Sequence, residues 1–169
     1  MPTELPRFIM RNAALFIDKD SYVGQASEIQ FPKVKRKMEE IRNAGMEMPI
    51  EVAMGFELPE FSFKMTGHDP KTLKLFGLQI GTITPLMATA ALVDEDGATH
   101  SQVAFIRGIL KELSPDGYKA GDKAEVDYMI SVRSFRLQIA GDDIYEMDPF
   151  GVSVGGVSQT GNIRRALLA

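Results

Sequence analysis

The chain has 169 residues, of which 44% are hydrophobic and 25% are charged, and its formal net charge is −4. This length and composition are typical of a single globular domain with a sizeable core, while the acidic balance argues against a global basic field that grips nucleic acid. Because the chain contains no cysteine, its sequence excludes disulfides, thiolate catalysis and cysteine-based metal sites.

The first strand is expected at residues 12–18, an apolar stretch that ends in the turn-prone segment 18–21. Arg11 interrupts the apolar residues of the N-terminal segment, so we expect no signal peptide. No apolar run approaches the roughly 18 residues of a membrane-spanning helix, so we expect no membrane anchor. A second strand is expected at 27–32, where apolar residues alternate with polar ones.

A basic cluster follows, comprising Lys33, Lys35, Arg36 and Lys37. Such a cluster most often forms a solvated face, and contact with another subunit or an anion is the alternative. The next residues, 37–49, favour a long loop or a short helical turn, because Gly45 and Pro49 interrupt the helix-forming residues.

The clearest alternation lies at residues 60–66, where every second residue is apolar and the others are polar. This pattern predicts a strand with one buried and one wet face. Residues 68–78 predict the one helix of the chain, because Asp69 can cap its start and Pro70 suits its first position.

A hairpin is expected at residues 85–113 around the turn Asp96-Gly97. Four alanines occupy its strand positions and suggest that another layer or another chain approaches closely: Ala88, Ala90, Ala91 and Ala104. Residues 114–122 are expected to form a loop.

The longest strand-like stretch begins near residue 122 and changes its apolar face halfway. Its first apolar side chains stand at even positions up to Val132, and the next stand at odd positions from Phe135. Side chains of a regular strand alternate at a period of two, so this switch predicts a bulge or bend at Arg133 and Ser134. Gly141-Asp142 then closes a hairpin with the next strand.

These elements favour one domain over 1–169, dominated by β-structure: an antiparallel β-sandwich or barrel with one short α-helix packed on it. We expect mobile arms at about 1–10 and at about 150–169, the latter beginning with a glycine-rich stretch. That stretch lacks the sequence motif of a phosphate-binding loop.

No catalytic pattern stands out. The two histidines, His68 and His100, have no metal-ligand spacing, and the acidic residues gather at turns, where Asp is common for structural reasons. We therefore expect no enzyme activity, no metal and no cofactor.

Three segments carry a family resemblance: "KRKMEEIRNAGM" (35–46), "RLQIAGDDIYEMD" (136–148) and "NIRRALL" (162–168). In this order they resemble the major tail tube proteins of contractile-tailed bacteriophages, and are also similar to tubes of contractile bacteriocins. The resemblance implies six-fold rings that stack into a hollow tube, through which DNA passes without specific binding. The implied partners are further copies of the chain, a tail sheath, a baseplate, and terminator or connector proteins. The implied location is the virion, after synthesis in the host bacterial cytoplasm.

Two sets of residues are candidates for assembly on this interpretation. The segment around 33–49 offers subunit contacts at Lys35, Arg36, Arg42, Ala44, Gly45 and Met46. The polar faces of two alternating strands offer a lumen lining at Glu28, Gln30, Glu60, Ser62, Lys64 and Thr66. An ordinary solvent-facing sheet gives the same alternation.

Three other functions stay open: the tube of a bacteriocin or injection particle, a small-molecule-binding β-barrel, and a carbohydrate-active β-sandwich enzyme. The barrel would need an apolar internal cavity, and the enzyme would need convergent carboxylates in a cleft.

Overall fold

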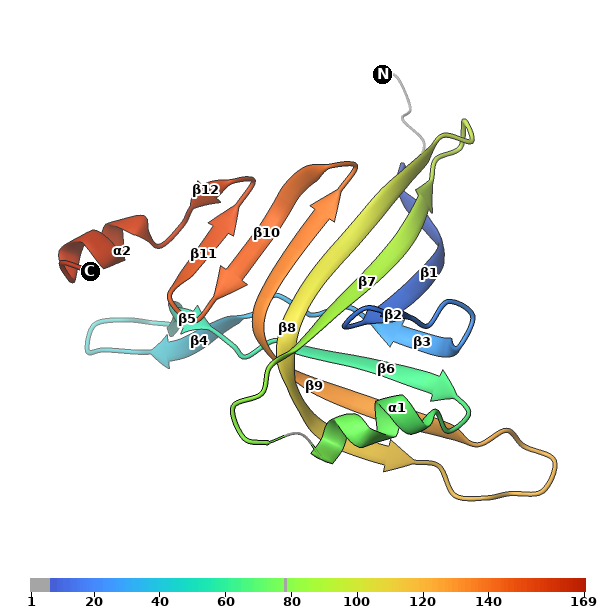
Figure 1. Ribbon diagram of the computed structural model, residues 1–169. Coiled ribbons are helices and arrows are strands. Elements are labelled where there is room, and N and C mark those ends of the chain that lie inside the picture. The colour runs from blue at the N-terminus through green and yellow to red at the C-terminus, as the bar shows by residue number, and fades with distance from the viewer. Residues whose placement is uncertain (1–6, 78) are drawn as a thin grey trace.

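The computed structural model describes residues 7–77 and 79–169, which form an antiparallel β-structure with two short helices (Figure 1). The strands are β1 (Ile9–Ile17), β2 (Asp20–Ser21), β3 (Ala26–Gln30), β4 (Arg36–Ile41), β5 (Ile50–Phe56), β6 (Glu60–Thr66), β7 (Thr84–Val93), β8 (Thr99–Pro115), β9 (Glu125–Ile139), β10 (Asp142–Asp148), β11 (Gly151–Val154) and β12 (Val157–Ser158). The helices are α1 (Pro70–Leu73), which continues into the 3-10 turn η1 (Lys74–Gly77), and α2 (Gly161–Ala166). The predicted all-β antiparallel class is confirmed.

Two layers share the long strands β8 and β9 (Figure 1). The short layer has the strand order β3-β6-β9-β8 and uses the first half of β9 with the end of β8. The long layer has the order β12-β11-β10-β9-β8-β7-β1-β2 and uses the other halves. The layers pack as a sandwich with open edges and do not close into a barrel, so the sandwich form of the prediction holds.

The bend of β9 lies at Arg133. On the neighbouring strand, Arg107 pairs with Ser134 and the next residue, Gly108, pairs with Val132, so Arg133 is an extra residue. Such a bulge bends a strand and increases its twist. One edge of β9 pairs with β8 throughout, and the opposite edge changes partner at this point. On that edge, β6 pairs with β9 up to Ser131, and β10 pairs with it from Phe135 onward.

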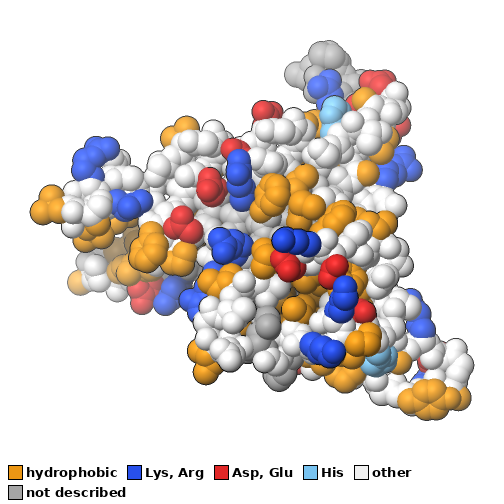
Figure 2. Space-filling view, viewed as in Figure 1, with side chains coloured by type: hydrophobic (Ala, Val, Ile, Leu, Met, Phe, Trp, Pro, Cys, Tyr) orange, Lys and Arg blue, Asp and Glu red, His pale blue; other side chains and the backbone are white. Residues whose placement is uncertain are grey.

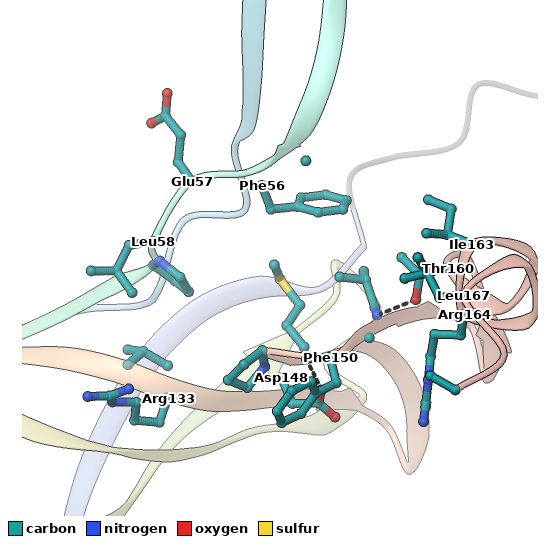
Figure 3. A pocket seen from close by; sticks show the side chains of 18 of the residues that line it. Phe56, Glu57, Leu58, Arg133, Asp148, Phe150, Thr160, Ile163, Arg164 and Leu167 are labelled. Atoms are coloured by element: carbon teal, nitrogen blue, oxygen red, sulfur yellow. Dashed lines mark hydrogen bonds between the residues drawn. The ribbon is translucent and has the colours of Figure 1, made fainter.

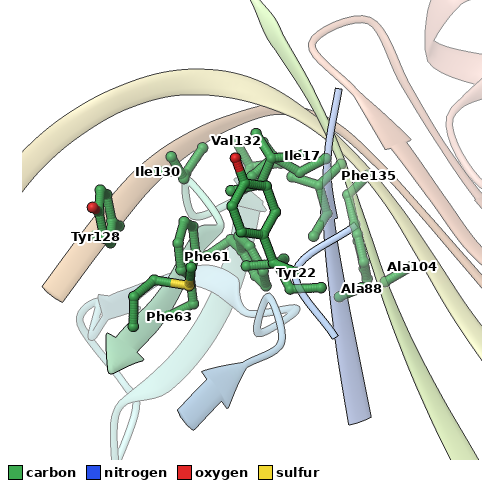
Figure 4. Packing of buried hydrophobic residues seen from close by; sticks show 14 of the residues in the cluster. Ile17, Tyr22, Phe61, Phe63, Ala88, Ala104, Tyr128, Ile130, Val132 and Phe135 are labelled. Atoms are coloured by element: carbon green, nitrogen blue, oxygen red, sulfur yellow. The ribbon is translucent and has the colours of Figure 1, made fainter. Parts of the chain in front are cut away.

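The core fills the space between the two layers (Figure 4). Apolar side chains of the short layer, such as Phe61 and Phe63, meet those of the long layer, such as Phe135. The rings of Phe63 and Tyr128 stack with their centres 4.8 Å apart. Ala88 and Ala104 are completely buried and pair across β7 and β8, in agreement with the close approach that their size indicated.

Helix α1 covers the inner face of the short layer and is fixed there by a polar contact. Asp69 caps the helix, because its carboxylate accepts hydrogen bonds from the Thr72 amide at 3.0 Å and the Thr72 hydroxyl at 2.8 Å. Thr72 is fully buried, and the Tyr22 hydroxyl also bonds to Asp69. The cap and the proline at the start are as predicted, but the α-helix covers only four residues of the expected 68–78.

The prediction of a loop or helical turn at 37–49 holds for residues 42–49, which form the connecting loop, but is wrong for 37–41, which form most of β4. These residues belong to a two-stranded hairpin, β4 with β5, that extends away from the body (Figure 1). Lys, Met and Glu in β4 have high helix propensity and so suggest a helix. All residues of β4 are exposed, so its sequence lacks the alternation of apolar and polar residues that marks a half-buried strand. Backbone pairing with β5 decides the structure, and Gly45 with φ of 89° shapes the turn.

Regular elements occupy the described parts of the two segments for which mobile arms are expected. Residues 1–6 of the expected N-terminal arm lie outside the described residues, and β1 already begins at Ile9. In the C-terminal segment, β11 and β12 extend the long layer, and α2 follows. The second helix was not expected from the sequence.

Candidate assembly surfaces

The hairpin that includes the expected loop holds all six subunit-contact candidates. Lys35 lies at its base, where its ammonium group is 3.2 Å from the Glu57 carboxylate, and Arg36 pairs with Phe56. The others surround the turn at the tip, where Arg42 Nε donates to the carbonyl of Met46 at 3.3 Å. The structure thus separates the candidates into two at the base and four at the tip.

The hairpin carries many exposed apolar side chains for a polar-looking segment. They are Met38, Ile41, Met48, Ile50 and Met54. A two-stranded hairpin alone is marginally stable in water, and exposed apolar side chains in this number mark an interaction surface. The hairpin is therefore suited to contact with another protein.

The outer face of the short layer is polar and holds the six lumen candidates. The strands β3 and β6 are neighbours, so Gln30 stands beside Ser62 and Glu28 beside Lys64. The structure extends this face to the ends of β8 and β9, which sequence reasoning did not include. The surface depression here, of about 320 Å³, is lined by Glu112, Ser114 and Asp127 in addition to residues of β3 and β6.

Both strand lysines of this polar face are held by carboxylates. Lys64 lies 3.9 Å from Glu28 and 3.8 Å from Asp127, and Lys111 lies 2.6 Å from Glu60. The hydrogen bond and charge of Glu60 raise the pKa of Lys111. The face also carries further acidic groups, with these five carboxylates in all: Glu28, Glu60, Glu112, Glu125 and Asp127. Its charge is thus predominantly negative.

The short layer has two open edges. On one side, β3 has β6 as its only strand partner within 7–77 and 79–169. On the other side, β7 pairs with β8 only as far as Gly108, so residues 109–115 lack a second strand partner among the described residues. Open strand edges offer unpaired amide and carbonyl groups to another chain.

An apolar groove of about 830 Å³ lies between the base of the hairpin, the bulge of β9, the β10–β11 turn and α2 (Figure 3). Its apolar lining includes Phe56, Leu58, Met147, Phe150, Ile163 and Leu167. Figure 2 shows hydrophobic side chains on the lobe at the left of the view, where α2 and the hairpin lie in Figure 1. Sequence reasoning missed this groove because its residues come from four distant segments.

The two arginines near the bulge differ in their surroundings. Arg136 is satisfied within the chain, with its guanidinium 3.0 Å from the carboxylate of Asp143. The Gln138 amide and Arg136 together lower the pKa of Asp143. Arg133, the extra residue of the strand switch, is exposed, and no carboxylate pairs with it among the described residues. Ser134, the other predicted switch residue, pairs regularly with Arg107.

Within the described ranges, no group of three or more His, Asp or Glu side chains is arranged to hold a metal ion. In the same residues, no helix is long and apolar enough to cross a membrane. The surfaces that stand out are thus two open edges, one polar face, one exposed hairpin and one apolar groove.

Comparison with known proteins gives a consistent result. The model of the family described as "Phage tail tube protein FII" matches residues 6–167. The tail tube protein of Escherichia phage P2 is 26% identical over 157 residues, which cover 89% of this chain and 91% of that protein. The major tail tube protein of Serratia phage KSP20 is 22% identical over 139 residues, which cover 82% and 81%.

Solved structures with a similar fold come from contractile injection systems. A chain in the structure of the sheath/tube terminator of an extracellular contractile injection system (PVC) has a TM-score of 0.59 and 10% identity, and the match covers 80% of this chain and 99% of that one. A chain of the sheath-tube complex of that system has a TM-score of 0.55 and 10% identity, and covers 81% and 93%. At these identities the likeness concerns the fold.

Proposed function

The chain belongs to the phage tail tube protein FII family and is a tail tube subunit, and we propose that it forms six-fold rings that stack into the hollow inner tube of a contractile tail. The observation that carries this proposal is the pair of open edges on the short layer. The proposed role is structural, and assembly rather than catalysis uses the surfaces described above.

The strand order of the short layer supports ring formation. All neighbours in β3-β6-β9-β8 are antiparallel, so β3 and β8, at the two edges, run in opposite directions. The β3 edge of one copy can therefore pair with the β8 edge of the next and continue the antiparallel alternation. A ring built in this way would join the short layers of all subunits into one closed sheet without free edges.

The polar face supports a lumen lining. In such a ring, the face of the short layer that is covered by the core and α1 would point away from the ring axis. The opposite, polar face would then point to the axis. The predominantly negative charge and the pairing of both lysines favour passage of DNA. Unpaired lysines would bind the DNA phosphates and displace their counterions, and this release would hold the DNA in place. We propose that Glu28, Gln30, Glu60, Ser62, Lys64 and Thr66 line this conduit.

The remaining surfaces suit further partners. We propose that the hairpin with Lys35, Arg36, Arg42, Ala44, Gly45 and Met46 contacts neighbouring subunits, and that the tube meets a sheath, a baseplate and a terminator protein. The solved structures of similar fold come from such sheath, tube, baseplate and cap assemblies. As a tail tube subunit the protein is a virion component, and we propose that it is made in the host bacterial cytoplasm.

One alternative has an observation in its favour. The solved structures of similar fold belong to contractile injection systems, so a tube of such a particle is the second candidate. A closed small-molecule-binding barrel is disfavoured by the open sheet edges.

Electron microscopy of the purified full chain in negative stain tests the proposal. We expect rings with a central hole, and stacks of these rings at higher protein concentration. Single globular particles at all concentrations would count against the proposal, as would rings without six-fold symmetry.

A further inference from the structure

The β4–β5 hairpin contains two carboxylates that face each other without compensation. Glu40 pairs directly with Glu51 across the strands, next to the pair formed by Ile41 and Ile50. Like charges at directly opposite positions destabilise a hairpin. No cation forms an ion pair with either carboxylate within 7–77 and 79–169, and both side chains are exposed. The hairpin thus lacks a positive partner.

The apolar groove has the opposite imbalance. Of its four charged residues, Glu57 is paired with Lys35, and the Asp148 carboxylate accepts a hydrogen bond from the Phe150 amide at 2.7 Å. Arg133 and Arg164 have no ion-pair partner in the described part of the chain and are exposed. They lie on opposite sides of the groove, whose floor is apolar (Figure 3).

We propose that the β4–β5 hairpin of one copy docks in the groove of another copy, with Glu40 and Glu51 paired to Arg133 and Arg164. Met38, which lies on the same face of the hairpin as Glu40, would cover part of the apolar lining of the groove, whereas Ile41 and Ile50 lie on the opposite face. A hairpin cannot fill its own groove, because its base at Gly55 to Pro59 forms one wall and its tip points away from the body (Figure 1).

This contact joins rings rather than subunits within a ring. It rests on the proposed function, in which the edges of β3 and β8 close the ring. The hairpin and the groove belong to neither of these edges, so they are free to meet the adjacent ring. The bulge residue Arg133 would then have two roles: it bends β9 and supplies a cation to the ring-to-ring contact.

Charge exchange tests the pairing. We expect Glu40→Lys with Glu51→Lys to shorten tubes at least tenfold in micrographs while rings persist, and Arg133→Glu with Arg164→Glu to do the same. The chain with all four changes should recover tubes, because each pair is restored with opposite signs. Circular dichroism and thermal unfolding of each variant exclude misfolding as the cause of lost tubes.

Glu95→Lys with Asp96→Lys, at the exposed turn between β7 and β8, is the matched control for Glu40→Lys with Glu51→Lys, because both variants replace two carboxylates with two lysines and so raise the net charge equally. This variant should form tubes of normal length. Normal tubes from either charge-reversed pair would overturn the inference and leave the proposed function standing. Loss in both pairs without recovery in the four-site variant would overturn it too. Absence of rings and tubes from the unmodified chain would instead contradict the proposed function.

Discussion

Val132 and Phe135 stand three positions apart in β9, yet both side chains are buried in one core, with 3% and 2% of their surfaces exposed. In a regular strand, residues three apart point to opposite faces. The extra residue Arg133 removes this conflict and bends the strand. One strand can therefore pair with β6 in the short layer and with β10 in the long layer.

Gly108 is the residue that the bend requires on the neighbouring strand. A Cβ atom there would overlap the backbone oxygen of Ser131 and lie 2.7 Å from Cγ2 of Ile130. We expect Gly108→Ala to lower the free energy of unfolding by about 1–3 kcal/mol, the range for overpacking of a dense core, as measured by urea denaturation.

Gly117→Ala is the control for this change, since no atom lies within 4 Å of a Cβ built at Gly117. Its free energy of unfolding should change by less than about 0.5 kcal/mol. Equal stability of the two variants would show that the close approach at Gly108 is not required.

Local patterns were sufficient to predict much of the fold. Alternation predicted β6, Asp96-Gly97 predicted the turn between β7 and β8, and the change of parity located the bend near Arg133. Each signal depends on residues close together in the chain. Strand β4 was mispredicted because its exposed side chains show no burial pattern, and only backbone pairing defines it.

The surfaces were harder to predict for a related reason. The lumen candidates of β3 and β6 do lie side by side, but the continuation of that face to Asp127 and Glu112 depends on pairing between distant strands. The groove combines residues of β5, β9 and α2, which no local pattern connects. Whether these surfaces make contacts in a tube is a property of several chains.

The cap of α1 gives the protein a predictable acid sensitivity. Burial raises the pKa of Asp69, but hydrogen bonds from Thr72 and Tyr22 outweigh this, so its pKa lies below the ordinary value of an aspartate. A lowered pKa in the folded state stabilises the fold above pH 4 or so, and this contribution is lost as the pH falls through the folded pKa.

We expect Asp69→Ala to lower the free energy of unfolding by about 1 kcal/mol at pH 7, as for other helix caps. The difference from the unmodified protein should shrink at pH 3. Urea denaturation at both pH values measures it, with the exposed Asp96→Ala as control. A difference that is the same at both pH values would show that the charge of Asp69 is unimportant.

Tyr22 gives a second pH signal, at the alkaline end. Burial, followed by the nearby charge of Asp69, raises the pKa of Tyr22 to about 12. A raised pKa stabilises the fold below pH 10 or so, and this contribution is lost as the pH rises through the folded pKa. In an absorbance titration the late ionisation should shrink in Tyr22→Phe without vanishing, because burial also raises the pKa of Tyr128. Unchanged titration of Tyr22→Phe would contradict this assignment.

The hairpin as a whole is expected to be necessary for assembly. Reversal of charge at Lys35, Arg36 and Arg42 changes its base and its tip together, and all three side chains are exposed. We expect the triple variant to sediment as a folded species that does not form tubes, with the circular dichroism spectrum of the unmodified protein. Tubes of normal length and number would exclude the hairpin from the contacts.

The central claim is that short layers join through β3 and β8 into a closed sheet whose polar face lines the tube. A cryo-electron microscopy reconstruction of assembled tubes tests it most directly, because it shows the edges and the axis in one map. We predict six subunits in each ring, antiparallel pairing of β3 with residues 109–115 of the next copy, and Ser62 and Lys64 directed to the lumen. A map in which these side chains face the outer surface of the tube would contradict the account.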